Sequence, residues 1–194
     1  MFNLPKEIVI LDLEITTWEG AIQRRWSGEG EHMEVIQMGA AKVETDNFET
    51  LDTFNCFVRP RVNPILSEYC KELTGIKQEQ VDSAEEFPVF IKEFAEWCGD
   101  LSLYCYGKIK KIPTMLDREA IIENSKLASI SSPFTEDKFN NINLIFHKHG
   151  YNVRQSGSTP EAFGLKLQNR PHNAMNDVNG LITGLKALKK AVSN

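Results

Sequence analysis

The chain lacks long hydrophobic runs. None of its segments reaches the roughly 18 consecutive apolar residues of a transmembrane helix, so we expect no membrane span and no membrane partner. The first residues, MFNLPKEIVILDLE, lack a basic segment ahead of an apolar one, which a signal peptide would need. We therefore expect a cytoplasmic protein.

Cysteine is scarce and its spacing does not suit a metal site. No C-x-x-C pair occurs among Cys56, Cys70, Cys98 and Cys105, which argues against a structural zinc site. Thiols in a reducing compartment behave as small hydrophobic side chains. We therefore expect the four cysteines to be buried and unpaired.

Positive charge is also in short supply, which is unusual for a protein that binds nucleic acid. The 22 Lys and Arg residues are outnumbered by 27 Asp and Glu residues, giving a net charge of −5. The balance differs between the halves: residues 1–100 hold 9 basic and 20 acidic residues, whereas residues 101–194 hold 13 and 7. This asymmetry is either ordinary surface charge or an acidic site beside a basic surface, as a metal-dependent enzyme acting on a polyanion needs.

Length and composition are those of an ordinary globular domain. The 194 residues are 41% hydrophobic and 25% charged, so residues 1–194 are predicted to form a single domain with its own core. Apolar patterns predict three successive strands, at 8–11, 35–44 and 51–58, joined as an antiparallel meander, and a fourth strand at 101–106.

Helices are predicted to follow the meander. Their expected ranges are 63–75, starting at Asn63-Pro64 and ending at Gly75, then 88–99, about 113–126, 141–149 and about 174–190. Strands first, then helices alternating with strands, predict a mixed α/β sheet with helices on its faces. The polar stretch 152–160 is predicted to be a mobile loop.

Two acidic residues stand at the end of the first predicted strand. Asp12 and Glu14 are two positions apart, so both side chains point to the same face of that strand. Adjacent carboxylates repel one another unless a cation lies between them, and a divalent metal ion is the usual solution. A solvent-facing strand end is the other interpretation of this pair.

A second polar cluster precedes the last predicted helix. In the segment HNAMND, His172 lies just before the helix and Asp177 lies in its first turn. Asp177 could join a set of metal ligands, and an imidazole beside it could accept a proton from a water molecule. Taken alone, the aspartate could equally cap the helix.

Taken together, these clusters resemble the DEDDh (DnaQ-like) 3′–5′ exonucleases. The resemblance rests on D-x-E in the first strand, H-x-x-x-x-D at the last helix, and an aromatic-glycine pair after the fourth strand. Residues 35–40 (VIQMGA) and 66–76 (LSEYCKELTGI) also resemble segments of that family. The most similar branch contains small histone-mRNA and interfering-RNA exonucleases.

The resemblance implies a ribonuclease-H-like fold with a five-stranded mixed sheet. It also implies metal-ion hydrolysis of the 3′-terminal phosphodiester of single-stranded RNA or DNA, with one or two Mg²⁺ or Mn²⁺ ions and release of nucleoside 5′-monophosphates. Asp12, Glu14 and Asp177 would be the metal ligands, and His172 the general base. The substrate contacts expected on this basis come from Ile15, Thr16, Thr17, Trp18, Gln37, Met38, Tyr106 and Lys108.

Several of these contacts also have a physical basis. Trp18 and Trp26, with basic residues between them, could stack on bases or cover the sheet edge. Lys108 could contact a phosphate or be an ordinary solvated side chain. His147 and His149 form an H-x-H pair, but on a helix these positions point apart, so we expect a surface role.

One position departs from the family pattern. Aligning Tyr106-Gly107 with the family's aromatic-glycine pair puts Lys110 where the second-motif aspartate belongs. The second metal could be lost, leaving a degenerate binding module. Alternatively, the Lys110 ammonium could take the place of that metal as part of the catalytic set, although an ammonium offers no Lewis-acid coordination. As a third possibility, Asp117 could supply the carboxylate from a shifted helix.

Overall fold

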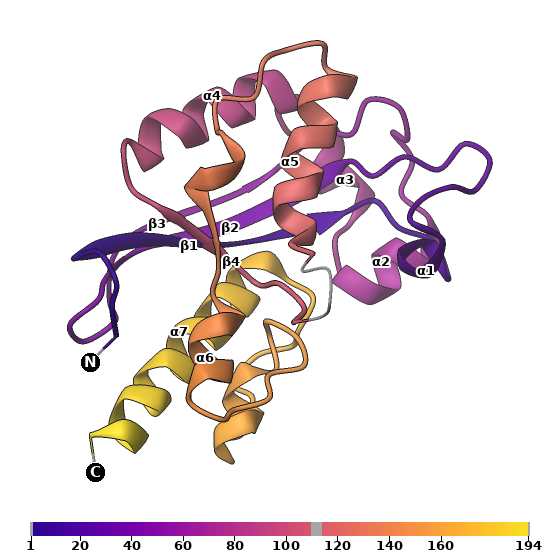
Figure 1. The fold of residues 1–194 in the computed structure, drawn as a ribbon. Helices are drawn as coiled ribbons and strands as arrows, with labels where there is room; N and C mark the ends of the chain where they lie inside the picture. Colours follow the sequence, from indigo (N-terminus) through magenta and orange to yellow (C-terminus); the bar gives the residue numbers. More distant parts are fainter. Residues whose placement is uncertain (1, 110–113, 194) are drawn as a thin grey trace.

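A mixed sheet forms the centre of the computed structural model, which describes residues 2–109 and 114–193 (Figure 1). Its five strands are β1 (Glu7–Ile15), β2 (Val35–Glu44), β3 (Glu49–Phe57), β4 (Leu103–Cys105) and β5 (Phe139–Asn141), in the order β3-β2-β1-β4-β5. The first three strands pair antiparallel, whereas β4 pairs parallel to β1 and β5 parallel to β4. The predicted meander and mixed sheet are confirmed.

Helices cover both faces of this sheet. The α-helices are α1 (Ala21–Arg24), α2 (Glu68–Thr74), α3 (Gln78–Asp82), α4 (Phe87–Cys98), α5 (Leu116–Leu127), α6 (Asn143–Lys148) and α7 (Ala174–Val192). Two 3₁₀ turns, η1 (Glu136–Lys138) and η2 (Thr159–Phe163), complete the elements. Figure 1 shows α4 and α5 above the sheet, and α6 and α7 below it.

The side chains of β1 alternate between these two layers. Val9, Leu11 and Leu13 belong to the hydrophobic cluster that includes α4 and α5. Ile8 and Ile10 belong to the cluster that includes α6 and α7. Because side chains alternate along a strand, the even-numbered Asp12 and Glu14 continue the face that α7 covers. The D-x-E pair therefore starts where the apolar side chains of that face end.

The helix predicted to begin at Asn63-Pro64 starts later than expected. The structure begins α2 at Glu68, with the Ser67 hydroxyl accepting a hydrogen bond from the Cys70 N–H at 3.0 Å. Asn63 instead ties two loops together, because its side chain accepts from the His32 N–H and donates to the Gly30 carbonyl. The predicted end of this helix at Gly75, which has a φ of 75°, is confirmed.

The segment 152–160, predicted to be a mobile loop, is packed against α7. Val153, Ser156 and Thr159 are buried, and η2 begins inside the segment. Close packing against glycines of α7 explains the difference: a Cβ at Gly184 would lie 2.2 Å from the Thr159 Cγ2. Small polar residues here are needed for close contact and do not indicate disorder.

Two further expectations concern the cysteines and the membrane. The four thiols are unpaired, and all are buried except Cys56, which is half-buried. Among the residues that the structure describes, no helix is both long and apolar enough to cross a bilayer.

Candidate active site

Asp12 and Glu14 are buried acids at the carboxyl-terminal half of β1. Their exposed fractions are 6% and 7%, and their partners across β2 are Gly39 and Gln37. Gly39 lets α7 approach this point, because a Cβ at position 39 would lie 2.4 Å from the Met175 backbone nitrogen. The first turn of α7 therefore lies beside the D-x-E pair.

The start of α7 brings Asp177 to the same place. The Asn173 side chain caps the helix by accepting from the Asn176 N–H, and the side-chain Oε1 of Gln37 accepts from the Ala174 N–H at 3.3 Å. Asp177 accepts hydrogen bonds from the Ser156 hydroxyl at 3.1 Å and from the His172 N–H at 3.2 Å. These contacts fix its buried carboxylate.

Asp117 approaches β1 from the other side of the sheet. Its Oδ1 accepts a hydrogen bond from the Leu13 N–H at 3.3 Å, between Asp12 and Glu14 in the chain. The N–H groups of β1 that face β4 are two residues apart. The Val9 N–H, two such positions before Leu13, donates to the Ser102 carbonyl oxygen just before β4. Since β4 ends at Cys105, the Asp117 carboxylate takes the place of a strand carbonyl for Leu13. Asp117 is 8% exposed.

Burial and mutual repulsion disfavour the ionised form of the four carboxyl groups. Burial, followed by the charges of Asp117, Asp177 and Glu14, raises the pKa of Asp12 well above its ordinary value. Burial and the charges of Asp177 and Asp117 do the same to the pKa of Glu14. Burial above all raises the pKa of Asp117 to about 7, against the lowering effect of the Leu13 N–H. The pKa of Asp177 is also raised by burial. A site of this kind favours a cation.

His172 completes the cluster. One ring nitrogen of His172 and one carboxylate oxygen each from Glu14 and Asp177 all lie within 4.8 Å of one another. The residue has a φ of 64°, in the left-handed region that residues other than glycine adopt uncommonly. Local strain of this kind gathers at functional sites, where the surroundings hold the backbone in place.

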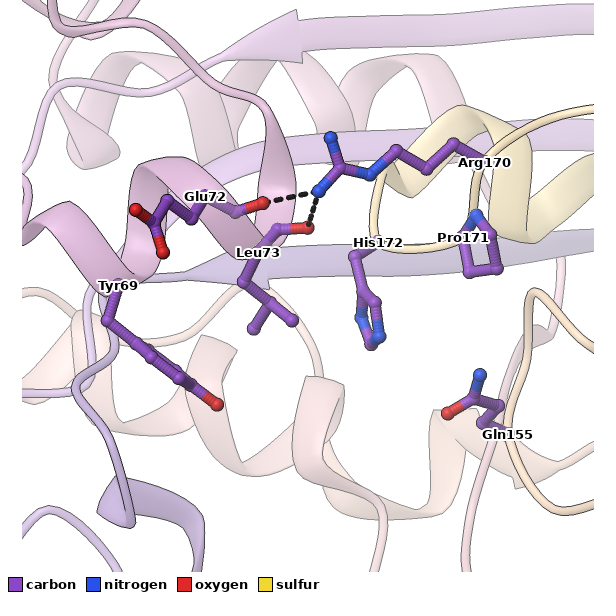
Figure 2. A pocket seen from close by; sticks show the side chains of 7 residues that line it. All are labelled: Tyr69, Glu72, Leu73, Gln155, Arg170, Pro171 and His172. Atoms are coloured by element: carbon purple, nitrogen blue, oxygen red, sulfur yellow. Dashed lines mark hydrogen bonds between the residues drawn. The ribbon is translucent and has the colours of Figure 1, made fainter.

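A pocket of about 350 Å³ opens beside His172 (Figure 2). Arg170 links its two sides by donating hydrogen bonds to the carbonyl oxygens of Glu72 and Leu73, at the end of α2. The imidazole of His172 lies between Leu73 and Gln155 in Figure 2, with Tyr69 further along the α2 side. The pocket therefore places an aromatic and an aliphatic side chain next to the acidic cluster.

Known proteins resemble this chain in sequence and in fold. The profile of the exonuclease family RNase T matches residues 9–183, which include both halves of the acidic cluster. The chain belongs to this exonuclease family. Mouse 3′-5′ exoribonuclease 1 is 32% identical over 177 residues, covering 88% of this chain and 49% of the mouse protein. The chain thus spans about half the length of the curated relatives that it matches over most of its own length.

Solved structures of exonucleases have the same fold as this family member. A full-length 3′-exonuclease superposes with a TM-score of 0.77 at 24% identity, over 97% of this chain and 84% of that one. The nuclease domain of 3′hExo, described as a DEDDh family member bound to rAMP, gives 0.75 at 25% identity, over 97% and 93%. The resemblance to DEDDh exonucleases, and the ribonuclease-H-like fold that it implied, are confirmed.

The predicted catalytic residues are brought together in this exonuclease domain. Asp12, Glu14, His172 and Asp177, which come from two distant segments, meet at one end of β1. Lys110 lies outside the described residues. Asp117, the third alternative for the missing aspartate, lies beside the Asp12–Glu14 pair. Sequence analysis did not single out Ser156, and only its small-residue context, QSGS, hinted at close packing.

Three residues that are predicted to contact the substrate are buried in the structure. Met38 is fully buried in the core. Gln37 is 1% exposed, and its amide bonds to Asn55 and to the start of α7. The Thr16 hydroxyl donates to the His32 carbonyl and accepts from the Glu34 N–H. These side chains pack and bond within the protein, and the contact of these three residues with a substrate stays a prediction.

The other residues predicted to contact the substrate differ in burial and in location. The Thr17 hydroxyl is buried and has no hydrogen-bond partner in the described residues, so its contact with a substrate stays a prediction. Ile15 is only 9% exposed, and Trp18 is half-buried, so their contacts stay predictions. Trp26 is structural, because its indole N–H donates to the Thr16 carbonyl at 2.7 Å. Tyr106 and Lys108 line a separate pocket.

Proposed function

We propose that this chain is a metal-dependent 3′–5′ exonuclease that removes nucleotides from the 3′ end of single-stranded nucleic acid. The observation that carries the proposal is the set of four buried carboxylates with raised pKa values beside the imidazole of His172. Membership of an exonuclease family supports the same reaction. Each cycle would hydrolyse the terminal phosphodiester and release a nucleoside 5′-monophosphate.

The acidic cluster fits divalent cations such as Mg²⁺ or Mn²⁺. Asp12, Glu14, Asp117 and Asp177 offer only oxygen donors, which these ions prefer, and their mutual repulsion is relieved when positive charge is bound. Bound cations would supply charge neutralisation and Lewis-acid activation at the scissile phosphate. In this proposal Asp117 is the fourth carboxylate, so the chain has a full acidic set whatever Lys110 does.

The chain's own residues would transfer the proton and hold the terminal nucleotide. A ring nitrogen of His172 would accept a proton from the attacking water, whose oxygen forms a bond to phosphorus as the bond to the leaving 3′ oxygen breaks. Thr17, which follows the acidic pair at the end of β1, would contact the terminal nucleotide. The pocket beside His172, with Tyr69 and Leu73, would hold its base or sugar. The leaving oxygen would take a proton from solvent.

RNA is the substrate that we propose to test first, since the mouse relative is named an exoribonuclease. The test is incubation of the purified chain with 5′-labelled single-stranded RNA and DNA of equal length, in Mg²⁺ and in Mn²⁺. We expect a ladder that shortens from the 3′ end, more rapidly on RNA. Asp12→Ala is expected to abolish the ladder.

His172→Asn is the matched variant for the proton acceptor, because asparagine tolerates the left-handed backbone that His172 adopts. We expect it to stay folded and to lose most activity. Retained binding of RNA without any ladder in both metals would overturn the exonuclease proposal in favour of a non-catalytic binding module. A ladder that persists in Asp12→Ala would point to a contaminating nuclease.

A further inference from the structure

A second pocket, of about 550 Å³, lies outside the acidic cluster. Three segments form it: the end of β4 and the residues after it, helix α6, and the chain that follows α6. Its lining residues are Tyr106, Lys108, Ile109, Asn143, His147, Gly150, Tyr151, Asn152, Val153 and Arg154. We refer to it as the α6 pocket.

The charge of the α6 pocket is opposite to that of the chain. The chain carries a net charge of −5, yet the pocket lining holds Lys108, Arg154 and the imidazole of His147, and no acidic residue. All three side chains are exposed. Within the described residues, none of them forms an ion pair. Lys108 and Arg154 are thus two uncompensated cations in a hollow, which suits a phosphate-bearing ligand.

Two tyrosine rings in the α6 pocket are held in fixed positions. The Tyr106 hydroxyl donates to the Val153 carbonyl at 2.9 Å. The Tyr151 ring stacks on Phe163, with the ring centres 4.3 Å apart and an interplanar angle of 27°. Ordered aromatic rings beside cations are the usual combination for binding single strands, because every base can stack on a ring and every phosphate can meet a charge.

One short segment joins the α6 pocket to the active site. Arg154 lines the α6 pocket, the next residue, Gln155, lines the pocket beside His172, and the next, Ser156, donates to Asp177. Three consecutive residues therefore touch the two pockets and the acidic cluster. A strand whose 3′ end lies beside His172 has only this segment to cross to reach Arg154.

We propose that the α6 pocket binds the sugar–phosphate backbone of the substrate strand upstream of its 3′-terminal nucleotide, with bases against the tyrosine rings. This inference rests on the proposed function, because it takes the 3′ end to lie beside His172. The occupant is a single strand of nucleic acid, held by charge and stacking without selection of base sequence.

The test is a comparison of binding by strand length. Full-length chain carrying Asp12→Ala, which we expect not to cut the probe, is titrated with labelled single-stranded RNA of about 3 and about 12 nucleotides, lengths that fall below and within the range of known single-strand sites. The same titrations are repeated with the double variant that carries both Asp12→Ala and Arg154→Ala. We expect the affinity for the longer strand to fall about tenfold and the affinity for the shorter strand to fall less than about twofold. For the longer strand, the plot of log K against log salt concentration should become less steep by about 0.7, because one phosphate contact is lost.

Two further variants serve as controls. Lys92→Ala removes an exposed cation on α4, on the opposite face of the sheet, and is expected to leave both affinities unchanged. Arg154→Lys keeps the charge and is expected to restore most of the affinity for the longer strand. A melting curve for each variant reports whether it is folded.

The inference is overturned if Arg154→Ala and Lys92→Ala have equal effects, if the loss is the same for both strand lengths, or if the longer strand does not bind. The cleavage assay on the unsubstituted chain separates this failure from failure of the proposed function. A normal ladder with no effect of Arg154→Ala on binding overturns only the proposed role of the α6 pocket. Length-dependent binding that is lost in Arg154→Ala, without any ladder, overturns the proposed exonuclease activity and leaves the role of the pocket standing.

Discussion

At the residue scale, the chain concentrates unfavourable charge at one point. Asp12, Glu14, Asp117 and Asp177 are all less than a tenth exposed, and burial raises the pKa of each. Buried acids without cationic partners cost stability, so their presence points to another purpose. Within the described residues their neutralising neighbours are weak: backbone N–H groups, including those of Leu13 and His172, the Ser156 hydroxyl and the imidazole of His172.

Asp117→Asn tests the assignment of the fourth carboxylate. Asparagine keeps an oxygen that can accept from the Leu13 N–H but removes the charge. We expect kcat/KM for RNA to fall by about a hundredfold or more, since losing one metal ligand costs several kcal/mol of transition-state stabilisation. The measurement is initial rates in saturating Mg²⁺, with Asp100→Asn, an exposed aspartate, as the matched control.

Lys110→Ala is the companion variant. If Lys110 replaced the second metal, Lys110→Ala would abolish activity and Asp117→Asn would have little effect. We expect Lys110→Ala to keep activity and Asp117→Asn to lose it. Unchanged activity in Asp117→Asn would contradict the assignment of the fourth carboxylate.

The sequence was informative where the spacing within one element fixes the geometry. Asp12 and Glu14 are two apart on a strand, and His172 and Asp177 flank the start of one helix, so local pattern was enough to pair them. Asp117 was harder because its place depends on how α5 docks against β1, and the count of residues from Tyr106 led to Lys110 instead. Burial of Gln37 and Thr16 was equally invisible, since polar residues are mostly exposed.

At the element scale, α7 positions half of the site. The helix begins against β2, with Gly39 under its first turn and Gln37 bonded to its first N–H. Its predicted range of about 174–190 agrees with the observed Ala174–Val192, because a long amphipathic pattern is a strong local signal. The start of α2 was misplaced, because Asn63 resembles a cap yet its side chain bonds to the loop that holds Gly30 and His32.

Gly39→Ala tests the close approach of α7 to the sheet. The added Cβ would lie 2.4 Å from the Met175 backbone nitrogen, so the helix must shift and carry His172 and Asp177 with it. We expect a loss of about 1–3 kcal/mol in unfolding free energy, or roughly 2–10 °C in Tm, with at least about a tenfold loss of activity.

Gly180→Ala, on the same helix, is the graded control for this contact. Its nearest neighbour would be 3.1 Å away, so a smaller change is expected. Equal effects of the two variants on Tm and on activity would argue against a special role for Gly39.

At the scale of the whole molecule, the acidic cluster links stability to pH. A carboxyl group whose pKa is higher in the folded chain binds protons more strongly there than in the unfolded chain. Its contribution to stability is therefore greatest at low pH and is lost as pH rises from the unfolded value of 3.8 to the folded value of about 7 for Asp117. Raised pKa values at Asp12, Glu14 and Asp177 act in the same direction.

We therefore expect the Tm of the metal-free chain to fall between about pH 5 and about pH 8. Added Mn²⁺ or Mg²⁺ should raise Tm, and by more at the higher pH, because the carboxylates bind metal only when deprotonated. Calorimetry in a chelator and then in metal gives both curves. Asp117→Asn should flatten the metal-free curve. A metal-free Tm that rises across this range, or no response to metal, would contradict the electrostatic picture.

The hydrogen bond from the Leu13 N–H to Asp117 has a consequence for how this domain can change over evolution. Because a side chain on α5 replaces the next strand carbonyl, the carboxylate is located by helix docking and not by its distance along the chain from β4. Related domains can therefore differ in the number of residues between β4 and α5 and still place a carboxylate at this point of β1.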